Sequence, residues 1–217
     1  MRRSMTIALT ATALLGLSAC GDGTEPLTQE QTREALLTDA DFPLDGFTAG
    51  DVTEGSADEG GEGDPLSDFP GQDQLSDECV EILEGLNELE TGFGAQSSVD
   101  FTGEEDAASP LGAPTVSVLV ASSEEGDNPL DAIDELNSAC EEVTIEEEGA
   151  EMTLGFEEIE ADAQGTRISM GVMGMTFDIT MVGRENAGNY AIVMGTGVSE
   201  EQIVEVLEAQ EEKMADL

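Results

Sequence analysis

The segment EMTLGFEEIEADAQGTRISMGVMGMTFDITMVGRENAGNYAIVMG, residues 151–195, decides the fold of this chain. Apolar and polar residues alternate along its successive runs, as they do in strands that bury one face and leave the other wet. A turn at 184–188 then brings the chain back as a further strand. The segment therefore predicts an antiparallel meander, with strands at 151–157, 168–172, 175–181 and 189–195.

Outside this segment, the pattern predicts two more strands, at 96–101 and 115–121. Four amphipathic helices are expected, and each has a start signal that can be read from the sequence. Their first residues are expected near Thr28, Ser76, Asn128 and Ser199, the last with Gln202 in a capping box. The sum is an α+β domain, in which helices pack on one face of an antiparallel sheet of about five to six strands.

The first twenty residues are typical of an exported protein. Two arginines precede an apolar run, and Leu17-Ser18-Ala19-Cys20 follows it. This arrangement resembles the lipobox of bacterial lipoproteins, whose cysteine carries fatty acids such as palmitate and becomes the mature N-terminus. An ordinary signal peptide, in which Cys20 is incidental, is the alternative. The resemblance predicts a protein that is anchored in the cell membrane through acylated Cys20 and faces the extracytoplasmic side.

The predicted organisation has three parts. Residues 1–19 are the signal peptide, residues 20–27 are a polar tether, and residues 28–217 form a single domain of ordinary size. A stretch at about 51–75 is rich in Asp, Glu, Gly, Pro and Ser, with little apolar content to bury. We therefore expect it to be a flexible acidic loop within the domain.

The two remaining cysteines lie at helical spacing with apolar residues. Cys79 falls on the apolar stripe of one predicted helix and Cys140 on that of another, so that both thiols face the core. An even number of cysteines in an oxidising compartment favours a disulfide. The sequence predicts a Cys79–Cys140 bond, with two free thiols as the alternative.

The charge of the chain is extreme. Asp and Glu number 50 and Lys and Arg six, which gives a formal net charge of −44. Such a surface repels nucleic acid, so nucleic acid is not an expected partner. Because the acids are spread over every segment, the composition favours adaptation to high salt. Binding of multivalent cations by the many carboxylates is the alternative interpretation.

The chain contains no histidine, and it lacks the sequence motifs of hydrolases and nucleotide-binding enzymes. Carboxylate pairs such as Glu157-Glu158, or the group Asp131, Asp134 and Glu135, are uninformative among so many acids. The acidic stretch from Asp39 to Asp45 resembles a calcium-binding loop only loosely. We therefore expect no catalytic activity and no cofactor.

Methionines cluster at Met170, Met173 and Met175. Thioethers favour Cu(I), so a copper site is one interpretation of this cluster. Adaptable core packing is another, and an apolar groove for a hydrophobic ligand is the third.

The order of elements after Cys79 resembles a known family. A helix with Cys79, a strand at 115–121, a helix that ends in Asn137-Ser138-Ala139-Cys140, a meander and a C-terminal helix follow one another. This order is similar to that of the extracellular sensor domain of actinobacterial serine/threonine kinases of the PknH type, a domain that also occurs in lipoproteins. The stretch LLTDADFP at 36–43 is similar to the segment with which that domain begins. The family typically has two disulfides, and this chain can form one.

The resemblance implies a noncatalytic domain with a cleft for an unidentified ligand, and it assigns no binding residue in this chain. Together with Cys20, it predicts a lipid-anchored, sensor-like or ligand-binding lipoprotein. Its partner would be a small molecule or a protein. A lipoprotein that handles copper through the methionines is the alternative function.

Overall fold

The computed structural model describes residues 25–55, 74–83, 93–104, 112–123, 128, 130–140, 143–147, 150–159, 161–172 and 175–217. The predicted signal peptide, Cys20, Met173 and most of the predicted acidic loop lie outside the described residues. Within the described part of the chain, no helix is long and apolar enough to cross a membrane.

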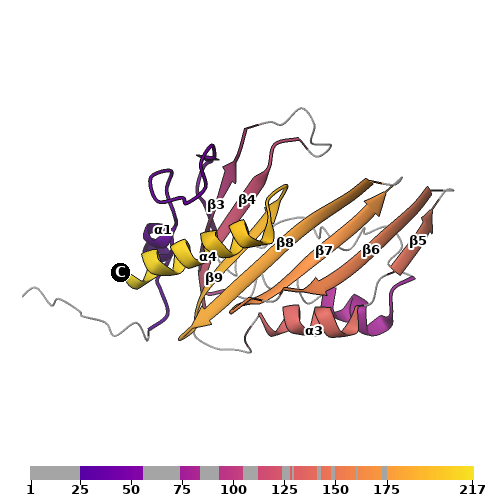
Figure 1. Ribbon diagram of the computed structural model, residues 1–217. Coiled ribbons are helices and arrows are strands. Elements are labelled where there is room, and N and C mark those ends of the chain that lie inside the picture. The colour runs from indigo at the N-terminus through magenta and orange to yellow at the C-terminus, as the bar shows by residue number, and fades with distance from the viewer. Residues whose placement is uncertain are drawn as a thin grey trace, which may run out of the picture.

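A single antiparallel sheet of nine strands organises the domain (Figure 1). Its order is β1-β3-β4-β9-β8-β7-β6-β5, with β2 paired to β3 beside β1. The strands are β1 Thr48–Ala49, β2 Thr53–Gly55, β3 Ala95–Thr102, β4 Thr115–Ser122, β5 Val143–Glu147, β6 Ala150–Glu158, β7 Gln164–Val172, β8 Met175–Asn186 and β9 Asn189–Thr196. The described helices are α1 Gln29–Ala35, α3 Asp131–Ala139, α4 Glu200–Ala215 and a helical segment at 77–83.

The meander predicted over 151–195 is confirmed. Strands β6, β7, β8 and β9 follow one another in sequence and lie side by side in the sheet. The two further predicted strands, at 96–101 and 115–121, correspond to β3 and β4, and β4 joins the meander by pairing with β9. All four predicted helices are present as well.

The sheet is larger than the predicted five to six strands, because three strands give little signal in the sequence. Strands β1 and β2 have two and three residues, and both pair with the edge of β3. Strand β5 has five residues, and its three β-branched residues are followed by two glutamates, so its strand signal is short. Strand β2 falls within the 51–75 stretch for which the sequence predicts a loop.

The helices cover both faces of the sheet, which corrects the prediction that they pack on one face. A Cβ atom on Gly183 of β8 would lie 2.6 Å from Leu130, at the start of α3, whereas one on Gly195 of β9 would contact Ile203 of α4. The register pairs Gly183 with Ile192, three residues from Gly195 along β9. Positions three residues apart on a strand point to opposite faces, so α3 and α4 lie on opposite sides. An amphipathic pattern shows that a helix buries one side, but not which face of the sheet covers it.

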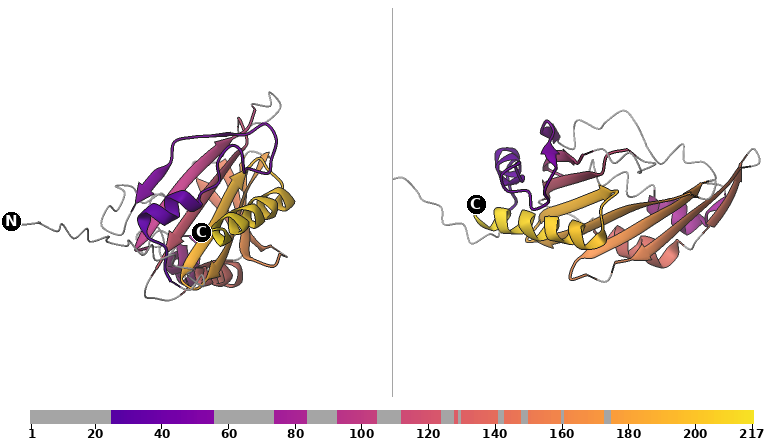
Figure 2. Two further views of the ribbon diagram at one scale, coloured as in Figure 1. Left: turned by 90° about the vertical axis from the view of Figure 1, so that its left-hand side faces the viewer. Right: turned by 45° about the horizontal axis from the view of Figure 1, so that its top comes forward.

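The main core lies between the sheet and the pair α1 and α4, which sit close together on one face (Figure 2). Gln210 of α4 is fully buried there, where its side chain donates to the Ala35 carbonyl at 2.8 Å and accepts from the Leu37 amide at 3.1 Å. These two bonds satisfy backbone groups at the end of α1, because a helix leaves its last carbonyls without partners in the helix itself. Helix α1 is thereby fixed against α4.

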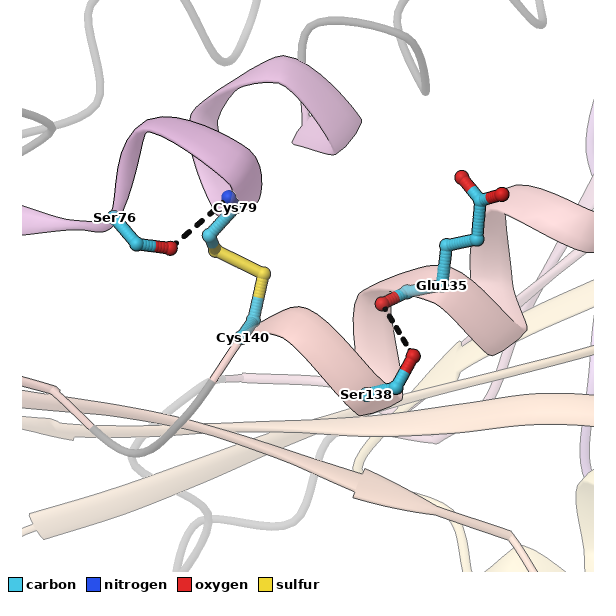
Figure 3. Close-up of a disulfide and its surroundings, with 5 residues drawn as sticks. All are labelled: Ser76, Cys79, Glu135, Ser138 and Cys140. Atoms are coloured by element: carbon cyan, nitrogen blue, oxygen red, sulfur yellow. Dashed lines mark hydrogen bonds between the residues drawn. A yellow bond between two sulfur atoms is a disulfide. The ribbon is translucent and has the colours of Figure 1, made fainter.

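The predicted disulfide is confirmed. Cys79 and Cys140 are bonded and buried, and their bond joins the helical segment 77–83 to the end of α3 (Figure 3). Leu83 and Leu136 pack around it with Phe156 of β6, in a small cluster separate from the main core. The Ser76 hydroxyl accepts from the Cys79 amide at 3.1 Å, as expected for the residue that precedes a helix.

Candidate functional site

The sheet face that α3 contacts carries a continuous set of apolar side chains beyond α3. In register order, Ile168 lies opposite Ile179, Met170 opposite Phe177, and Met181 opposite Met194. Because paired residues point to the same side, all of these belong to one face of β7, β8 and β9. We call this surface the methionine face and define it as Ile168, Met170, Met175, Phe177, Ile179, Met181 and Met194.

The methionine face is partly open to solvent. Met175 is 47 % exposed and Met194 is 43 % exposed, although both are long apolar side chains. Ile168, Met170, Phe177 and Ile179, on the same face, are half-buried. The sheet core under α4 differs sharply, since Val118, Val182 and Val193 there are completely buried. Met194 lies opposite Met181, about 20 Å along β8 from Met175, and Phe177 and Ile179 lie between them. An apolar patch of this extent is typical of a surface that contacts a ligand or a partner.

The structure brings two of the three predicted methionines to this surface. Met170 and Met175 point to the same face from neighbouring strands, but Met170 lies opposite Phe177 and Met175 opposite Val172. Met173 lies outside the described residues. Met181 and Met194, which the sequence places in or near the predicted sheet, also lie on this side through the alternation of β8 and β9. Knowledge of the strand register would have been needed to find that they are paired.

Few side chains in the described part of the chain are placed so that they could bind a metal ion together. No group of three His, Cys, Asp or Glu side chains lies close enough there to hold a metal ion. Diagonal neighbours on adjacent strands have Cα atoms about 7–8 Å apart, and Met170 and Met175 stand in this relation. Flexible thioethers at this separation suit contact with an apolar molecule, because methionine adapts its shape to what it touches.

Beyond the core under α4, the opposite face of β7 and β8 is polar. Ser169 donates to the Asp178 carboxylate at 2.7 Å, and Arg167 bonds both Glu157 of β6 and Glu200 of α4. This is the wet face that the alternation of the meander predicts. Its charged side chains are paired with one another across the strands and with α4.

Several of the carboxylates considered as catalytic or calcium-binding groups have structural partners. Glu157 is paired with Arg167, and both Asp131 and Asp134 accept hydrogen bonds from the Gln164 amide, at 3.2 and 2.9 Å. In the 39–45 stretch, Asp39 accepts from the Ala49 amide at 2.6 Å. Asp41 bonds Thr38 and Lys213. Hydrogen bonds from these two residues hold the pKa of Asp41 below its ordinary value.

A groove of about 520 Å³ lies between the helical segment 77–83 and α3. Its lining includes Glu78, Glu81 and Glu135 together with Ile82 and Ser138. The Ser138 hydroxyl donates to backbone carbonyls of its own helix, at Asp134 and Glu135, so it does not point a free donor into the groove (Figure 3). The three glutamates make the groove acidic. Because the rest of the surface is acidic as well, the charge of the groove does not distinguish it.

The fold is similar to that of a solved structure. The extracellular domain of PknH from Mycobacterium tuberculosis matches with a TM-score of 0.57 and 14% sequence identity, over 90% of this chain and 100% of that domain. The chain matches no protein-family profile and no curated protein sequence. The predicted resemblance to a PknH-type sensor domain is therefore confirmed at the level of the fold.

Proposed function

We propose that this chain is a lipid-anchored, extracytoplasmic, noncatalytic domain that binds an apolar ligand on its methionine face. The fold of a kinase's extracellular domain is the premise, and it is consistent with a sensor-like role. The exposure of Met175 and Met194 beside half-buried isoleucine and phenylalanine side chains is the observation that carries the proposal. The ligand would be an apolar small molecule or an apolar segment of a protein.

Energetics favour an apolar ligand on this surface. Covering apolar surface contributes roughly 25 cal/mol per Å². The methionine face offers no cationic side chain, because the basic residues of the described chain are engaged in ion pairs elsewhere. An anionic ligand would be repelled by the net charge of −44, so a neutral apolar molecule is the chemistry that fits.

A neutral fluorescent dye, Nile red, tests this surface. We expect saturable binding to the wild-type protein. Met175→Asp should weaken binding by about tenfold or more, because a carboxylate beside the dye must be desolvated. Thr176→Asp is the matched control, since it adds the same charge to the next residue of β8, which is exposed on the polar face. Equal affinities for the two variants would contradict the assignment of the site.

A copper-handling role is the second candidate, favoured by the placement of Met170 and Met175 on one half-exposed surface. Replacing both by leucine keeps the apolar surface and removes the thioethers that prefer Cu(I). Anaerobic titration with Cu(I) separates the two functions. Stoichiometric Cu(I) binding that the double Leu variant loses, with Nile red binding retained, would favour copper over an apolar ligand.

Lipid anchoring has a direct test of its own. Mass spectrometry of the protein purified from its native membrane should find acyl chains on Cys20, with residues 1–19 removed. Two or more acyl chains hold a protein stably on a bilayer, whereas one holds it only marginally. Cys20→Ser should therefore move the protein from the membrane fraction to the soluble fraction. An unmodified residue 20 would refute the anchor and leave the ligand-binding proposal to its own experiment.

A further inference from the structure

The first described residues are bound tightly to one end of the sheet. The Asn189 side chain accepts from the Leu27 amide at 2.7 Å and donates to the Glu25 carbonyl at 3.2 Å. The Ser122 hydroxyl donates to the Leu27 carbonyl at 2.6 Å. Asn189 and Ser122 are only 7 % and 2 % exposed, so these bonds are shielded from water. We call this set of contacts the N-terminal clamp.

The clamp lies beside the turn between β8 and β9. Residues 187 and 188 form that turn, and the Gly188 carbonyl accepts from the Ser123 amide at 2.9 Å, which ties the turn to the end of β4. Asn186, Ala187, Gly188 and Asn189 carry no charge, in a chain with 50 acidic residues. The Glu185 carboxylate accepts from the Gly188 amide at 2.6 Å, so the turn itself is uncharged but has one acidic side chain beside it.

The clamp limits how far the domain can be from an anchor at residue 20. Only residues 21–24 separate Cys20 from Glu25. Even a fully extended chain spans about 18 Å over those five steps, at up to ~3.6 Å per residue. The β8–β9 turn would then stay close to the bilayer surface, whatever conformation those four residues adopt.

The opposite end of β8 is far from this turn. Ten residues separate Thr176 from Asn186 along the strand, which corresponds to about 33 Å at ~3.3 Å per residue. Figure 1 shows β6, β7 and β8 extending away from the end where α1 and the C-terminus lie. The outer side of α4 presents Glu201, Glu205, Glu208 and Glu212 to solvent, so an anionic bilayer repels that side of the domain. An orientation with the α4 side flat against the membrane is thereby disfavoured.

We propose that the N-terminal clamp fixes the orientation of the domain on the membrane. The β8–β9 turn faces the lipid surface, and the end of the sheet with Met175 is presented away from it. The partner surface of the turn is a bilayer, and Asn189 acts as a positioning residue that shortens the tether. This inference rests on the proposed anchoring through Cys20.

Fluorescence energy transfer to a lipid acceptor tests the orientation. A donor dye is attached through an encoded azide residue at position 186 or 176, which leaves the cysteines untouched; both side chains are exposed on the same strand. The lipidated full chain is placed in vesicles of phosphatidylglycerol and phosphatidylethanolamine that carry an acceptor on some headgroups. Given the ~18 Å tether and the ~33 Å strand separation, we expect transfer from position 186 to exceed that from position 176 by about fivefold.

Two variants test the cause of this difference. Asn189→Leu combined with Ser122→Ala removes the clamp, and it should bring the two transfer efficiencies toward each other. Inserting about ten Gly and Ser residues between Gly23 and Thr24 leaves the clamp intact and lengthens the tether, because such linkers behave as flexible coils. This insertion should have the same effect even if the clamp variant folds poorly.

The outcomes separate this inference from the proposed function. Equal transfer from the two positions in protein that floats with the vesicles would overturn the orientation while leaving the anchor in place. An unequal ratio that the insertion does not change would show that contacts other than the tether orient the domain, and it would also overturn the inference. Protein that does not float with the vesicles refutes the anchor, and the orientation falls with it.

Discussion

Ala187 occupies a backbone conformation that glycine and asparagine adopt more easily. Its φ is 54° and that of Gly188 is 79°, and the two form a two-residue turn between the paired residues Asn186 and Asn189. Turns of this kind need positive φ at both central positions, and Asn-Gly is the preferred sequence. An alanine in this region costs about 1 kcal/mol or more.

Replacing Ala187 by asparagine should therefore stabilise the domain by about 0.5–1 kcal/mol. Urea denaturation of the domain, followed by circular dichroism, measures the effect. Ala187→Val is the opposite control, because a β-branched residue is strained at positive φ and should destabilise the domain. If valine were tolerated as well as asparagine, the turn would not have the conformation described.

Several residues could be placed from the sequence alone, and others could not. Ser199 with Gln202 was predicted to begin a helix, and the capping box is present in the structure. The pairing of Cys79 with Cys140 followed from their helical spacing and was correct. The role of Asn189 in binding Glu25 and Leu27 has no local signal, because the partners are more than 160 residues apart.

Among the elements, the helical segment 77–83 depends most on a single bond. It has seven described residues, and its apolar contacts form a small cluster around the disulfide that is separate from the main core. The bond spans a sequence separation of 61 residues. The chain-entropy model gives a stabilisation of about 4 kcal/mol for a loop of this length, although strain and residual structure often reduce it.

We expect Cys79→Ser combined with Cys140→Ser to lower the free energy of unfolding by up to about 4 kcal/mol. A shift in the urea midpoint, measured beside the unreduced wild type, reports this change. Hydrogen exchange should also increase first at 77–83, before it increases in the meander. An unchanged midpoint would mean that the disulfide contributes nothing to stability.

Helix α4 is held to the sheet by ion pairs, and the carboxylate of one of them has a raised pKa. Glu211 is paired with Arg184 of β8, yet burial raises the pKa of Glu211 above its ordinary value of 4.5; Arg184 opposes this shift, and Glu208 and Asp162 add to it. A carboxyl whose pKa is raised on folding contributes stability below its unfolded pKa and loses that contribution as pH rises through the folded pKa. Ionisation of Glu211 therefore disfavours the folded state.

Glu211→Gln should consequently gain stability relative to the wild type as pH rises from below 4.5 toward neutrality. Thermal melts of the two proteins at successive pH values give the difference. Asp41→Asn is the contrasting variant, since Lys213 and Thr38 lower the pKa of Asp41 and its contribution is lost as pH falls. If the difference in melting temperature between the wild type and Glu211→Gln did not change with pH, this account would be contradicted.

The sequence predicted the elements better than it predicted their arrangement. Alternation identified each strand of the meander, because one face is buried and the other is wet. Two- and three-residue strands such as β1 and β2 have too few residues for any period to show. The side of the sheet that α3 covers is decided by contacts such as Leu130 against Gly183, which lie far apart in sequence. The methionine face could be found only in part for the same reason.

At the scale of the whole molecule, repulsion between like charges far exceeds attraction between opposite charges, because the chain has 50 acidic residues and six basic ones. Arg33, Arg167, Arg184 and Lys213 are each paired with a glutamate or aspartate, as far as the described residues show. Most of the 50 acids have no cationic partner to offset their mutual repulsion. Salt weakens both effects, but repulsion involves many more pairs. The Debye length falls from about 10 Å at 0.1 M to about 3 Å at 1 M.

Raising sodium chloride from about 0.1 to 2 M should therefore increase the melting temperature, by roughly 5 °C or more if screening contributes about 2 kcal/mol. Scanning calorimetry across a chloride series measures it. Sucrose, which stabilises by exclusion from the protein surface without screening charge, is the control. A melting temperature that did not respond to chloride would refute adaptation to salt.

Strand β9 lies between β4 and β8 in the sheet, and this position affects the order in which the protein folds. Strands β5 to β9 form pairs between sequence neighbours, so they close short loops and should form early. The β4–β9 pairs join residues up to 81 positions apart, Thr115 with Thr196 for instance, and must close a long loop. In a chain that emerges N-terminus first, β3 and β4 are made long before β9. During synthesis, the edge of β4 that pairs with β9 therefore stays unpaired until β9 has emerged, near the end of the chain.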